Sequence, residues 1–225
     1  MNIILYHGSE ITVGQPIWGK GKKYNDYGLG FYCTENIDVA KEWAVDENRD
    51  GYINIYEMDL SGLTVLNLQS VDYCILHWLT VLLQNREFKT DSALARTAKK
   101  YLIDHFSTNY EEFDIIRGYR ADDSYFSFAQ DFLNGTISVR QLAEAMKLGR
   151  LGEQIVLKSK KSFDRIIFKD SEAVSAEEWF PKKSGRDDRA RMQYRQMNKD
   201  EWQRGDIYIT HILDEEIKPD DVRLR

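Results

Sequence analysis

The sequence predicts an α+β fold in which a β-sheet core carries a mostly helical insertion. Strand-like segments occur near both ends of the chain, while segments with a helical hydrophobic period are concentrated in the middle. No internal repeat or low-complexity segment interrupts this order. The length of 225 residues fits one domain with a large insertion. We therefore expect a single domain over residues 1–225, with the insertion at about 71–150.

The stretch 26–44 is expected to organise the first half of the chain. Gly28 and Gly30 permit a tight backbone just before a strand over residues 31–34. Thr34 is then the expected N-cap of a helix over 37–44, where apolar residues recur at helical spacing. The other strands are expected at residues 2–6, 52–60, 63–68, 113–117, 153–158, 163–169 and 206–212. The other helices are expected within residues 71–106, 124–133, 138–148 and 175–204, with a loop at 10–25.

Composition and charge narrow the class of protein. The hydrophobic share of 42% and the charged share of 30% are typical of a soluble globular protein. A net charge of −6 argues against non-specific nucleic-acid binding by the whole surface. Cys33 and Cys74 have no ligand-like spacing, which argues against a structural metal and for a reducing compartment. The longest apolar run, residues 74–83, is too short to span a bilayer, so we expect a cytoplasmic protein without membrane contact.

Four residues stand out as a candidate site. His7 follows the first strand, Tyr32 follows a Gly-x-Gly, Trp43 comes eleven residues later, and Glu153 opens a late strand. Taken singly, each of them fits an ordinary structural role. Tyr32 at a strand end and Trp43 two turns into a helix are expected to face one crevice, where two aromatic rings can hold a flat ring between them.

Taken together and in this order, four motifs resemble the His-Tyr-Glu class of ADP-ribosyltransferases, which includes the poly(ADP-ribose) polymerases and diphtheria-type toxins. The motifs are Leu5-Tyr6-His7-Gly8-Ser9, Gly28-Leu29-Gly30-Phe31-Tyr32, Ala40-Lys41-Glu42-Trp43 and Gly152-Glu153-Gln154-Ile155-Val156. The whole chain also resembles a bacterial toxin-like family of that superfamily, whose genes often lie beside a small partner gene. The resemblance implies an ADP-ribosyltransferase-like split β-sheet core. It further implies a mono-ADP-ribosyltransferase that acts as the toxin of a bacterial toxin–antitoxin or defence system and transfers ADP-ribose from NAD⁺ to a protein or nucleic-acid acceptor. A small antitoxin protein is the partner that this resemblance implies, and no metal is expected.

The resemblance also assigns roles to the site residues. Tyr32 and Trp43 would sandwich the nicotinamide ring, an attraction worth about 0.5–2 kcal/mol for each aromatic contact. His7 would bond a ribose hydroxyl, and the backbone of Gly8, followed by Ser9 in the same motif, would hold the carboxamide. Glu153 would bond the ribose 2′-hydroxyl and stabilise the charge that develops on the sugar. Such groups contribute about 10²–10⁴-fold to rate, so Glu153 should affect turnover more than NAD⁺ binding.

Departures from that pattern keep alternatives open. Ala40 stands where the polymerases commonly place a carboxamide-binding serine, and Trp43 replaces the usual tyrosine. Leu151, two residues before Glu153, argues against the Arg-Ser-Glu class of toxins. A module that binds NAD⁺ or a partner without transfer, and an NAD⁺ glycohydrolase, would share this site. The acceptor and the oligomeric state do not follow from the sequence.

Several polar segments have weaker claims to function. Asp122 and Asp123 are expected to be loop or capping residues, with contact to substrate as the second interpretation. The segment 182–204 holds eight Lys/Arg against four Asp/Glu, which predicts a solvated helix and, as an alternative, a contact with nucleic acid or a partner. Lys20, Lys22 and Lys23 are candidates for neutralising a diphosphate. The histidines that share no ligand spacing are treated as structural, namely His77, His105 and His211.

Overall fold

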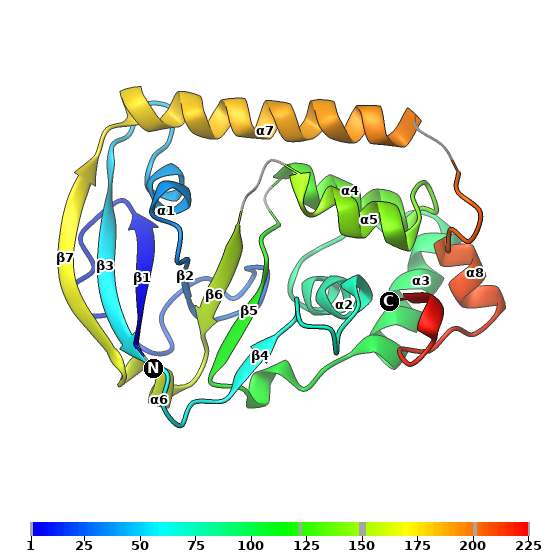
Figure 1. Ribbon diagram of the computed structural model, residues 1–225, viewed down its shortest axis with the longest axis horizontal. Coiled ribbons are helices and arrows are strands. Elements are labelled where there is room, and N and C mark those ends of the chain that lie inside the picture. The colour runs from blue at the N-terminus through cyan, green and yellow to red at the C-terminus, as the bar shows by residue number, and fades with distance from the viewer. Residues whose placement is uncertain (1, 122, 149–151, 200–201, 225) are drawn as a thin grey trace.

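The fold is α+β and contains two β-sheets (Figure 1). A computed structural model describes residues 2–121, 123–148, 152–199 and 202–224. The first sheet is antiparallel, in the order β1 (Asn2–Ser9), β3 (Gly51–Asp59), β7 (Ile166–Val174). The second runs β2 (Phe31–Cys33), β6 (Glu153–Leu157), β5 (Ile115–Tyr119), β4 (Val65–Asn67), and only its β4–β5 pair is parallel.

The two sheets meet at β1 and the end of β2. The amide of Tyr6 donates to the carbonyl of Thr34 at 2.8 Å, and the amide of Thr34 donates back to Tyr6 at 3.0 Å. Alternate side chains of both sheets fill the space between them, because successive residues of a strand point to opposite faces. This inter-sheet core consists of Ile3, Leu5, Tyr56 and Met58 from the first sheet and Cys33, Ile115, Ile155 and Leu157 from the second.

Helices cover the outer face of the second sheet and form the largest core of the protein. Their apolar faces pack on Ile116 and Val156, which point away from the inter-sheet core. These helices are α2 (Ile75–Asn85), α3 (Ala93–Phe106), α4 (Asp123–Leu133), α5 (Val139–Ala145) and α8 (Ile209–Asp214). Shorter elements are α6 (Lys160–Phe163) and the 3₁₀ turns Tyr110–Glu112 and Val222–Leu224. None of the helices in the described part of the chain is long and apolar enough to cross a membrane.

Two further helices connect the sheets to the helical part. Helix α1 (Ile37–Ala44) packs against β1 and β3, and α7 (Ala176–Lys199) runs over both α1 and α4 (Figure 1). Arg186 of α7 pairs with the buried Glu42 of α1 at 2.5 Å, and Tyr194 donates to Asp131 of α4 at 2.6 Å. A mostly polar helix that bridges two layers is thereby fixed to α1 at its middle and to α4 nearer its C-terminal end.

The structure confirms most of the predicted elements and corrects three of them. The N-cap of α1 is Asn36, whose side chain accepts from the amides of Asp38 and Val39, rather than Thr34. The backbone of Thr34 is still engaged in the bridge to Tyr6, so it cannot yet begin a helix.

The strand predicted at residues 206–212 is wrong, because Ile209–Asp214 form helix α8. Ile207 and Ile209 alternate as in a strand, but Ile209 and Ile212 are three residues apart and both are buried against the helical core. Residue Phe163 belongs to α6, so the strand predicted from 163 begins at Ile166 instead. Asp122 and Leu151, for which the sequence also supports predictions, lie outside the described residues.

Candidate functional site

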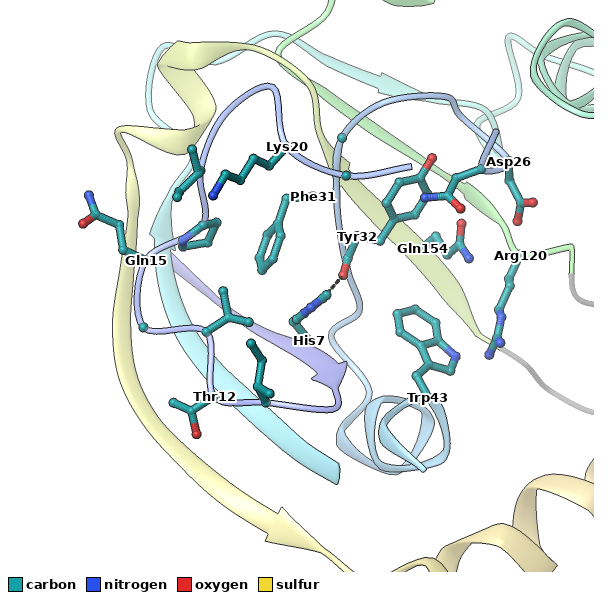
Figure 2. Close-up of a pocket in the computed structure, with 18 of the residues that line it drawn as sticks. His7, Thr12, Gln15, Lys20, Asp26, Phe31, Tyr32, Trp43, Arg120 and Gln154 are labelled. Carbon is teal, nitrogen blue, oxygen red and sulfur yellow. Dashed lines mark hydrogen bonds between the residues drawn. The ribbon is translucent and has the colours of Figure 1, made fainter. Parts of the chain in front are cut away.

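A cavity of about 770 Å³ opens where β1, β2 and α1 come together (Figure 2). Its wall also includes the loop 11–26, Gln154 of β6, and the segments that directly follow α2 and β5. Cavities of about 300–1,000 Å³ are typical of small-molecule and cofactor sites. Three of the residues predicted from the sequence, His7, Tyr32 and Trp43, line this cavity.

The ring of His7 is fixed in one orientation and one tautomer. Its Nδ1 lies 2.7 Å from the carbonyl oxygen of Tyr32, and the ring packs against Phe31 with 4.3 Å between centroids. A carbonyl only accepts, so Nδ1 carries the proton. Burial lowers the pKa of His7 below its ordinary value of 6.5, and the bond to Tyr32 opposes that only in part. The neutral ring therefore has Nε2 as a hydrogen-bond acceptor.

The hydroxyl of Tyr32 is used to fix its own ring. It donates to the carbonyl of Gly28 at 2.6 Å and accepts from the amide of Tyr27 at 3.1 Å. Burial raises the pKa of Tyr32 well above its ordinary value. The tight turn at Gly28, which has a positive φ of 71°, places its carbonyl where the hydroxyl can reach it. Tyr32 is thus suited to present a rigid ring and unsuited to transfer a proton.

Trp43 presents its indole to the same cavity from α1. The guanidinium of Arg120, directly after β5, lies over the ring at 4.8 Å from its centroid (Figure 2). A planar cation therefore occupies one face of this indole and is held there by a cation–π attraction. The indole Nε1 is buried and has no hydrogen-bond partner.

The structure does not bring Glu153 to the cavity with the other three residues. Its carboxylate accepts from Arg117 Nε at 2.9 Å, and the same guanidinium pairs with Glu35 at 2.5 Å. Burial by itself would lower the pKa of Arg117, but the bond to Glu153 raises it overall. Because adjacent residues of a strand face opposite ways, Gln154 lines the cavity instead.

Gly8, Ser9 and Ala40 lie next to the cavity and serve the packing of α1 and the loop. A Cβ on Gly8 would lie 2.1 Å from the carbonyl oxygen of Ala40, so only glycine lets α1 approach β1 this closely. The hydroxyl of Ser9 donates to the carbonyl of Ile11 at 2.7 Å and accepts from Asn54 at 2.8 Å. None of the three is among the residues that line the cavity.

The loop 10–25 is anchored rather than loose, and it closes one side of the cavity. The fully buried Asn54 accepts from the amide of Val13 at 2.6 Å, and its amide group also contacts β1. The hydroxyl of Tyr56 donates to the carbonyl of Val13. Trp18 donates to the carbonyl of Lys158 at 3.0 Å. These bonds tie the loop to β3 and to the residue that follows β6.

Charged residues that sequence reasoning missed complete the wall. The buried Asp26 accepts from Arg86 at 2.9 Å and from the amide of Ala121 at 2.9 Å. Lys20, one of the three lysines singled out in the sequence, lines the cavity, whereas Lys22 and Lys23 do not. With Arg120, the wall holds more positive than negative charge, as an anionic ligand requires. Within the described residues, no group of three or more His, Cys, Asp or Glu is placed to hold a metal ion.

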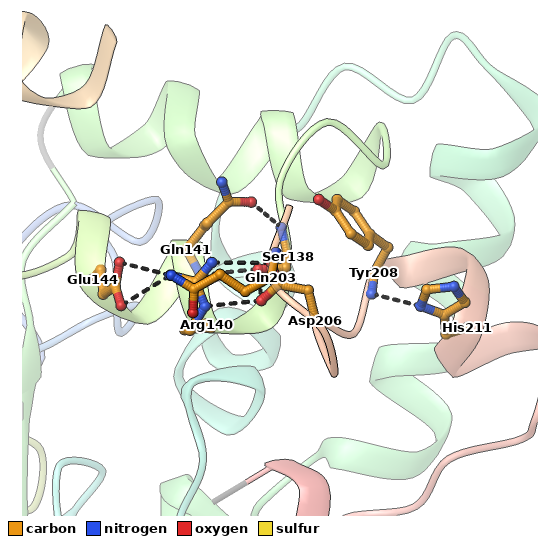
Figure 3. Close-up of polar contacts among 8 residues, drawn as sticks. All are labelled: Ser138, Arg140, Gln141, Glu144, Gln203, Asp206, Tyr208 and His211. Atoms are coloured by element: carbon orange, nitrogen blue, oxygen red, sulfur yellow. Dashed lines mark hydrogen bonds and ion pairs between the residues drawn. The ribbon is translucent and has the colours of Figure 1, made fainter. Parts of the chain in front are cut away.

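A second cavity, of about 400 Å³, lies between α5 and the segment after α7, and its wall contains a hydrogen-bonded cluster around Asp206 (Figure 3). Asp206, 8% exposed, accepts from Arg140 Nε at 2.8 Å and Nη2 at 3.0 Å. It also accepts from the hydroxyl of Ser138 and the amide of Gln203. Both oxygens of this carboxylate are thus hydrogen-bonded, and the bonds from Arg140 and Ser138 tie Asp206 to the start of α5.

The chain is an α+β protein with two joined sheets and a cavity where β1, β2 and α1 meet. The sequence model of the family described as "Protein of unknown function (DUF3990)" matches residues 3–168, and the chain belongs to that family. The match includes all four motifs of the predicted site. Neither the curated proteins nor the solved structures contain a match to the chain.

Proposed function

We propose that this protein binds NAD⁺ in the cavity and transfers ADP-ribose from it to a protein or nucleic-acid acceptor. The observation that supports this most is the convergence of His7, Tyr32 and Trp43 on one cavity. They come from β1, β2 and α1, and their order and spacing are those of the His-Tyr-Glu resemblance. The reaction breaks the bond between C1′ of the ribose and the nicotinamide nitrogen, and nicotinamide leaves with the electron pair. The acceptor nucleophile bonds to C1′ and loses a proton.

Each wall residue supports this proposal through a definite property. The unprotonated Nε2 of His7 can accept a hydrogen bond from a ribose hydroxyl. Tyr32 and Trp43 supply two aromatic rings, of which Tyr32 is fixed through its hydroxyl. Lys20 and Arg120 supply positive charge for the diphosphate.

Nicotinamide release from NAD⁺ by the purified protein, with cell lysate as a source of acceptors, tests the proposal. Glu153→Gln is the variant that the sequence motif selects. Glu35→Gln is its matched control, because Glu35 is the other carboxylate that pairs with Arg117. We expect release by the wild type and by Glu35→Gln, and a loss of about 10²-fold or more in Glu153→Gln. Equal release by all three would contradict the role of Glu153.

A second candidate function is NAD⁺ binding without transfer, and the position of Glu153 favours it. The carboxylate is held by Arg117, and Glu153 is not among the residues that line the cavity. Calorimetry that shows NAD⁺ binding, with no nicotinamide release in the presence of lysate, would establish this alternative.

A further inference from the structure

Two buried polar atoms without partners belong to the wall of the same cavity. Buried side-chain polar atoms are nearly always hydrogen-bonded, so each exception calls for a reason. Among the described residues these exceptions include Nε1 of Trp43 and Oε1 of Gln154, and both side chains line the cavity. Gln154 is only 6% exposed, and in Figure 2 it is seen between the rings of Tyr32 and Trp43.

The surrounding wall does not supply what these two atoms need. The indole Nε1 is a donor and requires an acceptor, but the group that lies over its ring is the Arg120 guanidinium, which holds donors only. The carbonyl oxygen of Gln154 is an acceptor and requires a donor. Gln154 is also the one polar residue in the run 154–157 of β6, where its neighbours Ile155, Val156 and Leu157 belong to the cores.

A ligand that satisfies both atoms must offer an acceptor to Trp43 and a donor to Gln154. A primary carboxamide has this pattern, because its carbonyl accepts while its amino group donates. We infer that Trp43 and Gln154 select the carboxamide of the bound ring. Trp43 Nε1 donates to the carboxamide oxygen, and Gln154 Oε1 accepts from its nitrogen. The inference rests on the proposed function, since it identifies the ring as nicotinamide.

This pair also gives a physical reason why Ala40 is tolerated. A serine at position 40 is the carboxamide contact that the resemblance leads one to expect, and Ala40 has no hydroxyl to provide it. Trp43 and Gln154 provide a donor and an acceptor from α1 and β6 instead. Trp43 then meets the bound ring with the edge of its indole, where the N–H lies, while Tyr32 offers a ring face.

The test compares NAD⁺ with 3-acetylpyridine adenine dinucleotide, in which a methyl ketone replaces the carboxamide. The ketone keeps the acceptor for Trp43 but offers no donor to Gln154, whichever way the Gln154 amide is turned. Calorimetric titration of the wild type should show NAD⁺ binding about fivefold to tenfold more tightly than the analogue, the range of one net hydrogen bond.

Two variants separate the two contacts. Gln154→Met has a similar length and no polar atom, so it should bind NAD⁺ about as weakly as the analogue and lose the preference between them. Trp43→Phe keeps a ring and removes the N–H, so it should weaken both dinucleotides by a similar factor and keep the preference. A purely structural role of Gln154 would weaken both dinucleotides equally in Gln154→Met and leave the preference intact.

Three results would overturn the inference. They are equal binding of both dinucleotides by the wild type, a preference that survives in Gln154→Met, and a preference that disappears in Trp43→Phe. The first result is measured on the wild type alone, so this test remains decisive even if a variant fails to fold. A wild type that binds neither dinucleotide would contradict the proposed function itself, and that outcome is distinct from equal binding of both.

Discussion

Replacing Gly8 by alanine should destabilise the protein by moving α1 away from β1. The added Cβ would lie 2.1 Å from the carbonyl oxygen of Ala40, 2.7 Å from the amide nitrogen of Ala44 and 2.9 Å from Cβ of Trp43. Two of these three atoms are backbone, so a change of rotamer cannot relieve the contact. The helix must shift by about 1 Å to restore ordinary van der Waals distances.

The expected loss of stability can be taken from the cost of overpacking in protein interiors in general. Forcing extra atoms into a packed interior costs about 1–3 kcal/mol, and backbone displacement places Gly8→Ala in the upper part of that range. For a chain of this length each kcal/mol lowers Tm by about 2–4 °C, so a fall of about 4–12 °C is expected. The same substitution at Gly185 in α7 is the control.

Gly185→Ala should have the opposite sign. Its Cβ would meet only Nη1 of Arg189, at 3.4 Å, which is the far end of a flexible side chain. Alanine inside a helix is about 1 kcal/mol more favourable than glycine, so Tm should rise by about 2–4 °C. Scanning calorimetry of both variants tests the reasoning. A Gly8→Ala protein that melts at or above the wild-type temperature would refute it.

Three other predictions follow from single side chains. Because the pKa of His7 is lowered in the folded state, the unfolded chain binds a proton first as the pH falls through about 6.5. The urea concentration at the unfolding midpoint should therefore decrease as the pH is lowered from about 7.5 to about 5.5. This decrease should be smaller in His7→Gln. Asp206→Asn should lower the free energy of unfolding in urea by about 2–3 kcal/mol, because it leaves Arg140 without its buried carboxylate. Glu144 is an exposed partner of the same guanidinium, so Glu144→Gln should change this free energy by less than about 0.5 kcal/mol. Asn54→Ala removes the bond that anchors the loop 10–25, so limited proteolysis within this loop should become faster, and an unchanged cleavage rate would contradict that account.

The kinds and order of most elements could be predicted because the hydrophobic period is a local signal. Strand β3 alternates in burial over residues 54–59, and α2 is apolar at most of its positions, whatever lies around them. Where the hydrophobic pattern was short or fitted both periods, tertiary packing determined whether a helix or a strand formed. Ile207, Ile209 and Ile212 support both periods, and only the helical core against which Ile209 and Ile212 pack selects the helix.

The candidate site was predictable only where it rests on sequence-local motifs. His7, Tyr32 and Trp43 follow recognisable turns and strands, and the structure brings them to one cavity. The pairing of Asp26 with Arg86 joins residues sixty positions apart, and no local pattern signals it.

Whether Glu153 or Gln154 faces the cavity depends on the register of β6. A shift by one residue would exchange their faces, and the register is set by pairing with β2 and β5 rather than by the motif itself. A signal was nevertheless present in the sequence. Strand alternation alone says that two adjacent residues cannot both face one site, and Gln154 is a polar residue followed by three apolar ones.

The most direct test of the central claim is a calorimetric titration of NAD⁺ into the wild type, Trp43→Ala and Trp202→Ala. Trp202 is 68% exposed and is not among the residues that line the cavity, so it controls for the loss of an indole in general. The account predicts that NAD⁺ binds the wild type and Trp202→Ala equally, and Trp43→Ala about tenfold more weakly. No binding to the wild type, or the same affinity in all three proteins, would contradict it.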